Sequence, residues 1–109
     1  ELSQNPEASL NAQRDELKKK RNRLKTLPVK RDAALVLVDE LEQKLGSFDA
    51  RYAEPGFFER VTPAELTQMQ VDKEATQTAL SQAISDWEAL ELEISELEQL
   101  LNSGDSGSN

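Results

Sequence analysis

Residues 62–101 read TPAELTQMQVDKEATQTALSQAISDWEALELEISELEQLL, and this stretch decides the fold class. Neither Gly nor Pro interrupts residues 64–103. Two interleaved seven-residue ladders run through it, made up of Leu66, Lys73, Leu80, Trp87, Ile94 and Leu101 and of Met69, Thr76, Ala83, Leu90 and Leu97. A heptad of apolar positions is typical of a helix that buries one narrow seam against another helix.

The preceding part of the chain repeats the pattern. Its seam residues are Leu24, Leu27, Ala34, Val38, Leu41, Leu45, Phe48 and Tyr52, with Arg31 at a further seam position. The segment EPGFFERV lies between the two heptad regions and contains a Pro-Gly turn signal. A connection this short favours an antiparallel arrangement of neighbouring helices. We therefore expect an all-α protein, an antiparallel two-helix coiled-coil hairpin with a basic helical N-terminal extension.

Local signals set the expected boundaries. Thr62-Pro63-Ala64-Glu65 is a capping box with Pro at the first helical position, and it predicts a helix start there. We expect a flexible segment at 1–13, a hairpin domain at 14–101 with its tip at 54–62, and a disordered tail at 102–109. Pro28 either kinks a continuous helix or lies in the first turn of a new helix, and we favour the new helix. The short start and the Ser/Gly tail suggest a fragment of a longer protein.

Composition excludes several chemistries. The 109 residues contain no Cys and no His, which rules out disulfides, thiolate or imidazole metal ligands and catalysis by either side chain. No apolar run approaches the ~20 residues that span a bilayer. Carboxylates on an exposed helix without a pocket are solvated surface rather than general acids or bases. We expect no enzyme activity, no cofactor and no metal in this chain, and no membrane partner.

The net charge of −8 hides a strong split along the chain. Residues 14–31 carry +7 and residues 32–109 carry −13. The basic positions of the first segment are Arg14, Lys18, Lys19, Lys20, Arg21, Arg23, Lys25, Lys30 and Arg31. Clustered cations on a helix favour binding to phosphates. The alternative is pairing with the acidic second helix, where Glu91, Glu93, Glu96 and Glu98 are expected opposite this segment. Both can hold in part.

Other residues have two interpretations each. Phe57 and Phe58 at the tip either contact a partner or fold back over the hairpin end, and we favour the second. Trp87 is expected in the core, with its indole N–H bonded or at an exposed edge. Lys73 and Arg31 at seam positions either extend their charges to solvent or fix the alignment of the helices. Gly46 either allows close helix approach or is simply tolerated.

A set of motifs resembles the C-terminal coiled-coil domain of ABC-F ATPases of the Uup type. These are a Leu27-Pro28 step, the acidic-leucine stretch at 39–42, the tip residues Pro55, Phe57 and Phe58, and Trp87-Glu88-Ala89-Leu90-Glu91. The resemblance covers residues 14–92. The chain departs from the family pattern at Arg31 and Lys73, and it continues past the Trp motif. A similar hairpin ends valyl-tRNA synthetases, but that family lacks the W-E-x-L-E ending and ranks lower.

The resemblance implies a non-catalytic accessory domain that binds DNA or ribosomal RNA, associates with ribosomes and acts in the cytoplasm. The ATP-binding cassettes of the parent ATPase would lie upstream. An alternative from another class is a structural coiled coil whose exposed Leu35, Leu37 and Leu92 dimerise or dock to a partner protein. The residues alone leave the target open between DNA, rRNA and tRNA.

Overall fold

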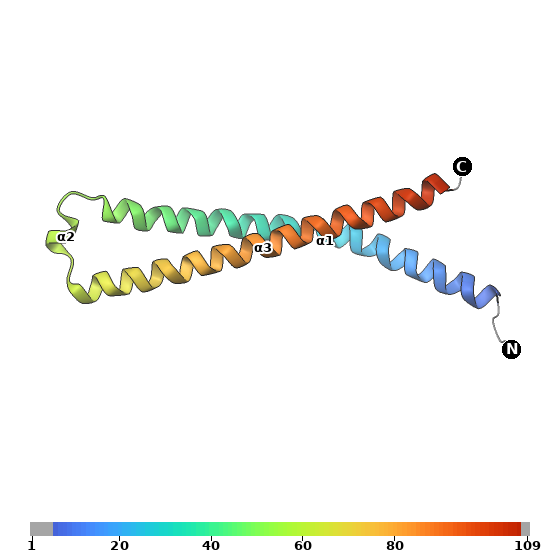
Figure 1. Ribbon diagram of the computed structural model, residues 1–109, viewed down its shortest axis with the longest axis horizontal. Helices are drawn as coiled ribbons and strands as arrows, with labels where there is room; N and C mark the ends of the chain where they lie inside the picture. The colour runs from blue at the N-terminus through green and yellow to red at the C-terminus, as the bar shows by residue number, and fades with distance from the viewer. Residues whose placement is uncertain (1–5, 108–109) are drawn as a thin grey trace. The chain divides into compact units, whose positions relative to one another are not determined.

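The computed structural model describes residues 6–107, with side chains at 8–103, and this part of the chain contains helices and no strand. The elements are α1 (Pro6–Tyr52), the one-turn α2 (Phe57–Arg60) and α3 (Pro63–Gly107), as Figure 1 shows. The expected all-α class is confirmed. The short helix in the connection has no counterpart in the sequence-based prediction.

The chain divides into two units. Unit 1 combines the chain up to Arg31 with the chain from Ala89 onward, and unit 2 is Asp32–Glu88. The whole basic segment 14–31 and the acidic end of α3 thus fall in unit 1. The tip at 54–62 falls in unit 2, together with all five aromatic residues.

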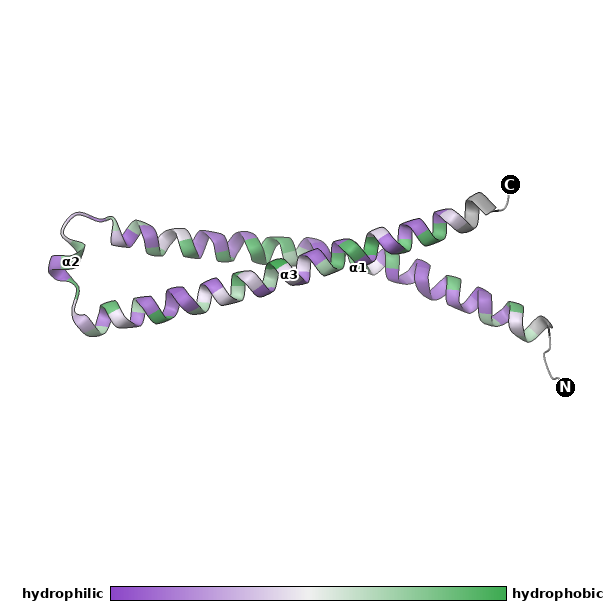
Figure 2. Ribbon diagram, in the orientation of Figure 1, coloured by the Kyte–Doolittle hydropathy of each residue, from purple (hydrophilic) through white to green (hydrophobic). Residues whose placement is uncertain are grey.

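Burial follows the predicted seam positions. The buried residues are Leu27, Val38, Phe48, Phe57, Met69, Thr76, Ala83 and Ile94, and all but Phe57 lie on the heptad ladders. The remaining ladder residues from Leu24 onward are half-buried. In Figure 2, green residues recur at intervals along α1 and α3 while purple prevails in the N-terminal part of α1. The heptad interpretation is confirmed, and it leaves most of each helix surface exposed to solvent.

The tip of unit 2 is held by an apolar cluster. Phe48 of α1, Phe57 of α2 and Met69 of α3 form it, and Tyr52, Val61 and Leu66 pack against it. Each of the three helices contributes one buried side chain. The short connection is therefore anchored to both long helices by burial of apolar surface.

The start of α3 agrees with the predicted capping box. The backbone N–H of Glu65 donates to Thr62 Oγ1 at 3.1 Å, and the backbone N–H of Thr62 donates to Glu65 Oε1 at 3.0 Å. The hydrogen bond from the Thr62 backbone N–H holds the pKa of Glu65 below its ordinary value, and the Thr62 hydroxyl beside the carboxylate lowers it further. Two amide donors that the helix itself leaves without acceptors are satisfied in this way.

Pro28 lies inside α1, so the favoured prediction of a new helix near Leu27 is wrong. A proline at this position removes the hydrogen bond that its amide would donate to the carbonyl of Leu24. Leu27 is 1% exposed and Pro28 is half-buried. We attribute the continuity of the helix to this burial, which offsets the loss of one backbone bond.

The two long helices extend into both predicted end segments. α1 begins at Pro6 and takes in residues 6–13, where Pro6 suits a first turn and the following residues include good helix formers. α3 continues to Gly107 and takes in residues 102–107. The flexibility of 1–13 and the disorder of 102–109 stay predictions. Residues 1–5 and 108–109 lie outside the described residues.

Substitution by alanine is expected to have opposite effects on stability at the two glycines of unit 2. A Cβ at Gly46 meets nothing within 4 Å, so Gly46→Ala should raise the free energy of unfolding by about 0.5–1 kcal/mol. Gly56 has φ +76°, and a Cβ there lies 2.9 Å from Arg60 Nη1. Gly56→Ala should therefore destabilise the chain. Urea unfolding followed by circular dichroism measures both, and equal effects would contradict the assignment.

The capping box predicts a pH dependence. Because its pKa is lowered in the folded state, Glu65 contributes stability above its unfolded pKa of about 4.3 and loses it as pH falls through the folded value. The stability difference between the wild type and Glu65→Ala should therefore be largest near neutral pH and shrink on acidification. Urea unfolding at a series of pH values between 7 and 2 measures it. A difference independent of pH would show that the carboxylate charge plays no part.

Candidate nucleic-acid interface

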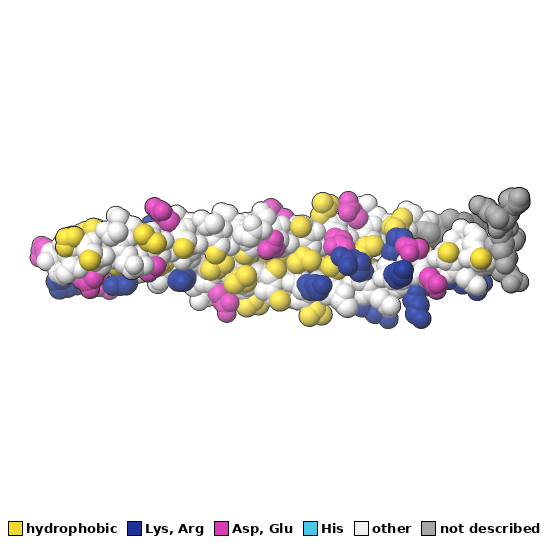
Figure 3. All heavy atoms as spheres, turned by 90° about the horizontal axis from the view of Figure 1, so that it is seen from below, with side chains coloured by type: hydrophobic (Ala, Val, Ile, Leu, Met, Phe, Trp, Pro, Cys, Tyr) yellow, Lys and Arg dark blue, Asp and Glu magenta, His cyan; other side chains and the backbone are white. Residues whose placement is uncertain are grey.

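The nine predicted phosphate-binding cations lie on α1 within unit 1. Lys20 and Arg31 are half-buried, and the other seven residues are exposed. Figure 3 shows dark-blue Lys and Arg side chains gathered over this part of α1. Their contacts divide the nine into groups that composition alone does not separate.

Two cations have a partner on their own helix. Lys19 Nζ lies 3.6 Å and Lys20 Nζ 3.8 Å from the carboxylate of Glu16, at i,i+3 and i,i+4 spacing. Such pairs on an exposed helix stabilise it by only about 0.2–0.5 kcal/mol. Glu16 nevertheless reduces the positive charge that this face of α1 presents to a phosphate.

Two further cations pair with α3. Arg23 forms an ion pair with Glu93, and Arg31 Nη1 lies 3.3 Å from Glu91 Oε1. The predicted pairing with the acidic helix is therefore confirmed for these two. Glu96 and Glu98 have no ion-pair partner among the residues whose side chains are described.

Four of the remaining cations form a single row. Arg14, Lys18, Arg21 and Lys25 follow one another at intervals of four, three and four residues, which places them within an arc of about 60° on the helix. All four are exposed, and none has an ion-pair partner among the described side chains. We name these four residues the phosphate stripe. Lys30 lies on a different face of α1.

The phosphate stripe is a purely ionic surface. The chain's aromatic residues all lie in unit 2, so no ring belonging to unit 1 accompanies the stripe. Stacking of bases on side chains and sequence readout both need other groups than these. The arrangement suits attraction to a phosphate backbone without preference for base sequence.

The two tip phenylalanines have different environments. Phe57 is 6% exposed and belongs to the apolar cluster, whereas Phe58 is 63% exposed. Phe58 stacks on Tyr52 with an interplanar angle of 7° and a centroid distance of 6.1 Å. Phe57 meets both rings edge-on, at 5.7 Å from Tyr52 and 5.0 Å from Phe58. The folded-back interpretation therefore holds for Phe57 and not for Phe58.

Lys73 at its seam position makes contacts that the heptad did not predict. Its Nζ lies 2.9 Å from Asp49 Oδ1 and 5.4 Å from the centroid of the Tyr52 ring. The hydrogen bond to Asp49 raises the pKa of Lys73, against a small opposing effect of burial. The only signal in the sequence is the cation at a seam position, which does not indicate its partner.

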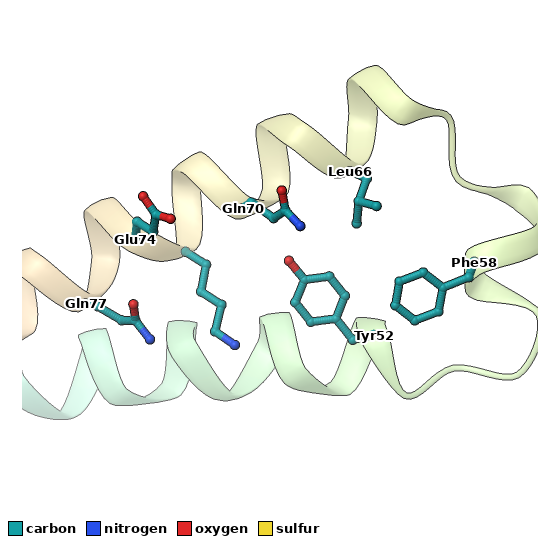
Figure 4. A pocket seen from close by; sticks show the side chains of 7 residues that line it. Tyr52, Phe58, Leu66, Gln70, Glu74 and Gln77 are labelled. Carbon is teal, nitrogen blue, oxygen red and sulfur yellow. The ribbon is translucent and has the colours of Figure 1, made fainter.

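A shallow groove of about 640 Å³ adjoins the tip. In Figure 4, Phe58 and Leu66 lie at one end, Glu74 and Gln77 lie at the other, and Gln70 lies between them. Tyr52 and Lys73 complete the lining. Sequence analysis missed this groove, because Gln70, Glu74 and Gln77 on α3 lie beside the seam rather than on it.

The described residues contain neither a membrane-spanning helix nor a metal centre. No helix in this part of the chain is long and apolar enough to cross a membrane. The side chains of residues 8–103 contain no cluster of three or more carboxylate, imidazole or thiol groups suited to a metal ion. Comparison with family models, with curated proteins and with solved structures gave no match.

The Arg23–Glu93 ion pair predicts a coupling between α1 and α3. Arg23→Glu and Glu93→Arg should each lower the free energy of unfolding, because each places like charges together. The double variant should recover a coupling energy of about 0.2–1 kcal/mol, which falls with added salt. Urea unfolding of the four proteins measures the cycle. Strictly additive effects of the two substitutions would show that the pair contributes nothing in solution.

Proposed function

We propose that this chain is a non-catalytic domain that binds the phosphate backbone of DNA or RNA through the phosphate stripe. The observation that carries the proposal is that four exposed cations share one helix face and have no ion-pair partner among the described side chains. Uncompensated cations in a row repel one another, and a polyanion relieves that repulsion. Release of the counterions condensed on the nucleic acid then supplies the affinity.

The dimensions of the stripe agree with one strand of a duplex. Arg14 and Lys25 are eleven residues apart, which is about 16 Å along a helix axis. One strand of a duplex advances 3.4 Å for each phosphate, so about five phosphates pass beside the stripe. Long, flexible Lys and Arg side chains follow such a backbone without a fixed register. Binding of this kind is electrostatic and independent of sequence.

The fold that we propose for this domain is an antiparallel two-helix coiled-coil hairpin. In unit 1, Arg23 pairs with Glu93 and Arg31 pairs with Glu91, so the partner's number falls as the position on α1 rises. In unit 2, Phe48 and Met69 belong to one buried cluster, and Tyr52 and Leu66, each nearer to the connection on its helix, both pack against that cluster. The helix contacts within each unit support opposite chain directions.

We further propose that the domain is the C-terminal part of an ABC-F type ATPase and acts in the cytoplasm on ribosomes or nucleic acid. Support comes from the order of the Leu27-Pro28 step, the aromatic tip and the Trp87 motif. ATP hydrolysis would belong to cassettes elsewhere in the parent protein. On this proposal the domain itself holds no cofactor and supplies affinity for the target.

A structural coiled coil that binds a second chain is the competing function. Leu35, Leu37 and Leu92 are exposed, as that interpretation requires. Molar mass measured by light scattering over a wide concentration range distinguishes the two. A dimer that forms with rising concentration and ignores nucleic acid would replace the present proposal.

The decisive test compares two variants of equal net charge. In one, the four stripe residues are changed to Gln, and in the other Lys19, Lys20, Arg23 and Lys30 are changed to Gln. Binding to a 20-base-pair DNA duplex and to single-stranded RNA is measured by anisotropy over a salt series. For the wild type, four contacts give a log–log slope of about −3.6 with duplex DNA and about −2.8 with a single strand.

The stripe variant should lose most of this affinity and slope, while the control variant keeps both. Circular dichroism verifies that helicity is unchanged in each. A slope near −8, which nine contacts would give with duplex DNA, would favour a diffuse basic surface over a stripe. Equal losses in the two variants, or no binding by the wild type at low salt, would refute the assignment.

A further inference from the structure

The tip of unit 2 presents an aromatic ring to solvent on a rigid support. Phe58 stacks on Tyr52 and meets Phe57 edge-on. Around it, Arg60 Nη1 donates to the carbonyl of Pro55 at 3.1 Å, and its Nη2 lies 3.7 Å from Glu54 Oε2. The exposed ring is thus held in place before any partner arrives, which lowers the entropic cost of binding.

The groove beside this ring has the size and lining of a peptide site. Its volume of about 640 Å³ lies in the range of ligand clefts. In Figure 4 the aromatic rings and Leu66 line one end of the groove. The amides of Gln70 and Gln77 and the carboxylate of Glu74 line the rest. Apolar surface at one end and hydrogen-bonding groups along α3 match the mixed character of a peptide chain.

Charge determines the kind of partner. Residues 49–74 hold six carboxylates against three cations, a net of −3. Two of these cations are already engaged, Lys73 by Asp49 and Arg60 by Glu54. Glu59 and Glu74 have no ion-pair partner among the described side chains. The region formed by residues 49–74, which includes the tip and the groove, therefore repels a phosphate backbone and attracts positive charge.

The molecule already contains the contact that such a partner would make. Lys73 places its ammonium over the Tyr52 ring while Asp49 accepts its hydrogen bond. The exposed face of Phe58 and the carboxylate of Glu74 offer the same two elements, a ring face and an acid, at opposite ends of the groove and therefore to two separate cations. An arginine, with its planar guanidinium, suits stacking on Phe58 better than a lysine.

We propose that the tip docks a short basic segment of a partner protein, with one arginine against Phe58 and a second cation at Glu74. Leu66 and Glu74, at opposite ends of the groove, are eight residues apart on α3, about 12 Å along the axis. An extended chain covers that length in about four residues. The two basic side chains are therefore expected about four positions apart. This docking site lies in unit 2 and does not depend on the phosphate stripe of unit 1.

The test uses the whole 109-residue chain and a labelled peptide, Arg-Leu-Ser-Leu-Arg. Its matched control is Glu-Leu-Ser-Leu-Glu, and a single-stranded oligonucleotide of equal length tests whether the tip binds nucleic acid instead. Anisotropy titrations should give a dissociation constant below about 1 mM for the basic peptide, weakening with salt, and no binding of the acidic one. Failure of the basic peptide to bind would overturn the proposal.

Variants locate the binding. Phe58→Ala and Glu74→Gln should each lower the affinity for the basic peptide by roughly two- to fivefold. Matched controls are Val71→Ala, which removes an exposed apolar side chain of α3 outside the groove, and Glu40→Gln, which removes an exposed carboxylate of α1. Neither control should change the affinity. Equal affinity of the wild type, Phe58→Ala and Glu74→Gln would overturn the proposal.

Two results separate this site from the nucleic-acid function. Oligonucleotide binding that Phe58→Ala weakens would overturn the basic-peptide proposal in favour of base stacking at the tip. If only the stripe variant weakens oligonucleotide binding, the nucleic acid binds at the phosphate stripe and not at the tip. The peptide titrations then decide the tip proposal. If Phe58→Ala loses helicity, Glu74→Gln decides the matter alone, because Glu74 is exposed and makes no hydrogen bond or ion pair with another described side chain.

Discussion

The structure depends on one narrow apolar seam. Unit 2 buries Val38 and Phe48 on α1 and three side chains on α3, and unit 1 buries one described side chain on each long helix, Leu27 and Ile94. A seam this thin provides burial but little discrimination between alternative alignments of the helices. The two cations at seam positions favour one alignment of the helices, because Lys73 pairs with Asp49 and Arg31 pairs with Glu91 only in that alignment. A shift of either helix by one turn would separate Lys73 from Asp49 and Arg31 from Glu91, at a small cost for each pair, because partly exposed ion pairs add little to stability.

The extent of the seam bears on the proposed role of the phosphate stripe. Leu27 is the first buried residue of α1 among those described, and Leu17 and Leu10, which precede Leu24 at seven-residue intervals, are exposed. Arg23, four residues before Leu27, still forms an ion pair with Glu93 of α3. The four stripe residues are exposed and have no ion-pair partner among the described side chains. Their charge is therefore not neutralised by a neighbouring acid in the described part of the chain.

Sequence alone predicted the features that depend on a repeated pattern or on residues close together in the chain. The heptad predicted the buried positions, and the Thr62–Glu65 box predicted the start of α3, because both depend on residues close in the chain. The pairing of Arg23 with Glu93 required the relative alignment of two helices, which a repeat does not specify. The path of α1 through Pro28 was misjudged because local propensity opposed it while burial of Leu27 favoured it. Phe57 and Phe58 look alike in sequence and differ only through the geometry of α2.

The charge split has a consequence for selectivity. A uniformly basic coiled coil would bind any polyanion along its whole length, and a uniformly acidic one would bind none. Here the phosphate stripe carries four cations in unit 1, whereas residues 49–74 of unit 2 carry −3. On the two proposals made above, phosphates are attracted by the first surface and repelled by the second, and a basic peptide experiences the reverse. Each surface would then exclude the ligand of the other through its charge, and the proposed nucleic acid and the proposed basic segment would not compete for one surface.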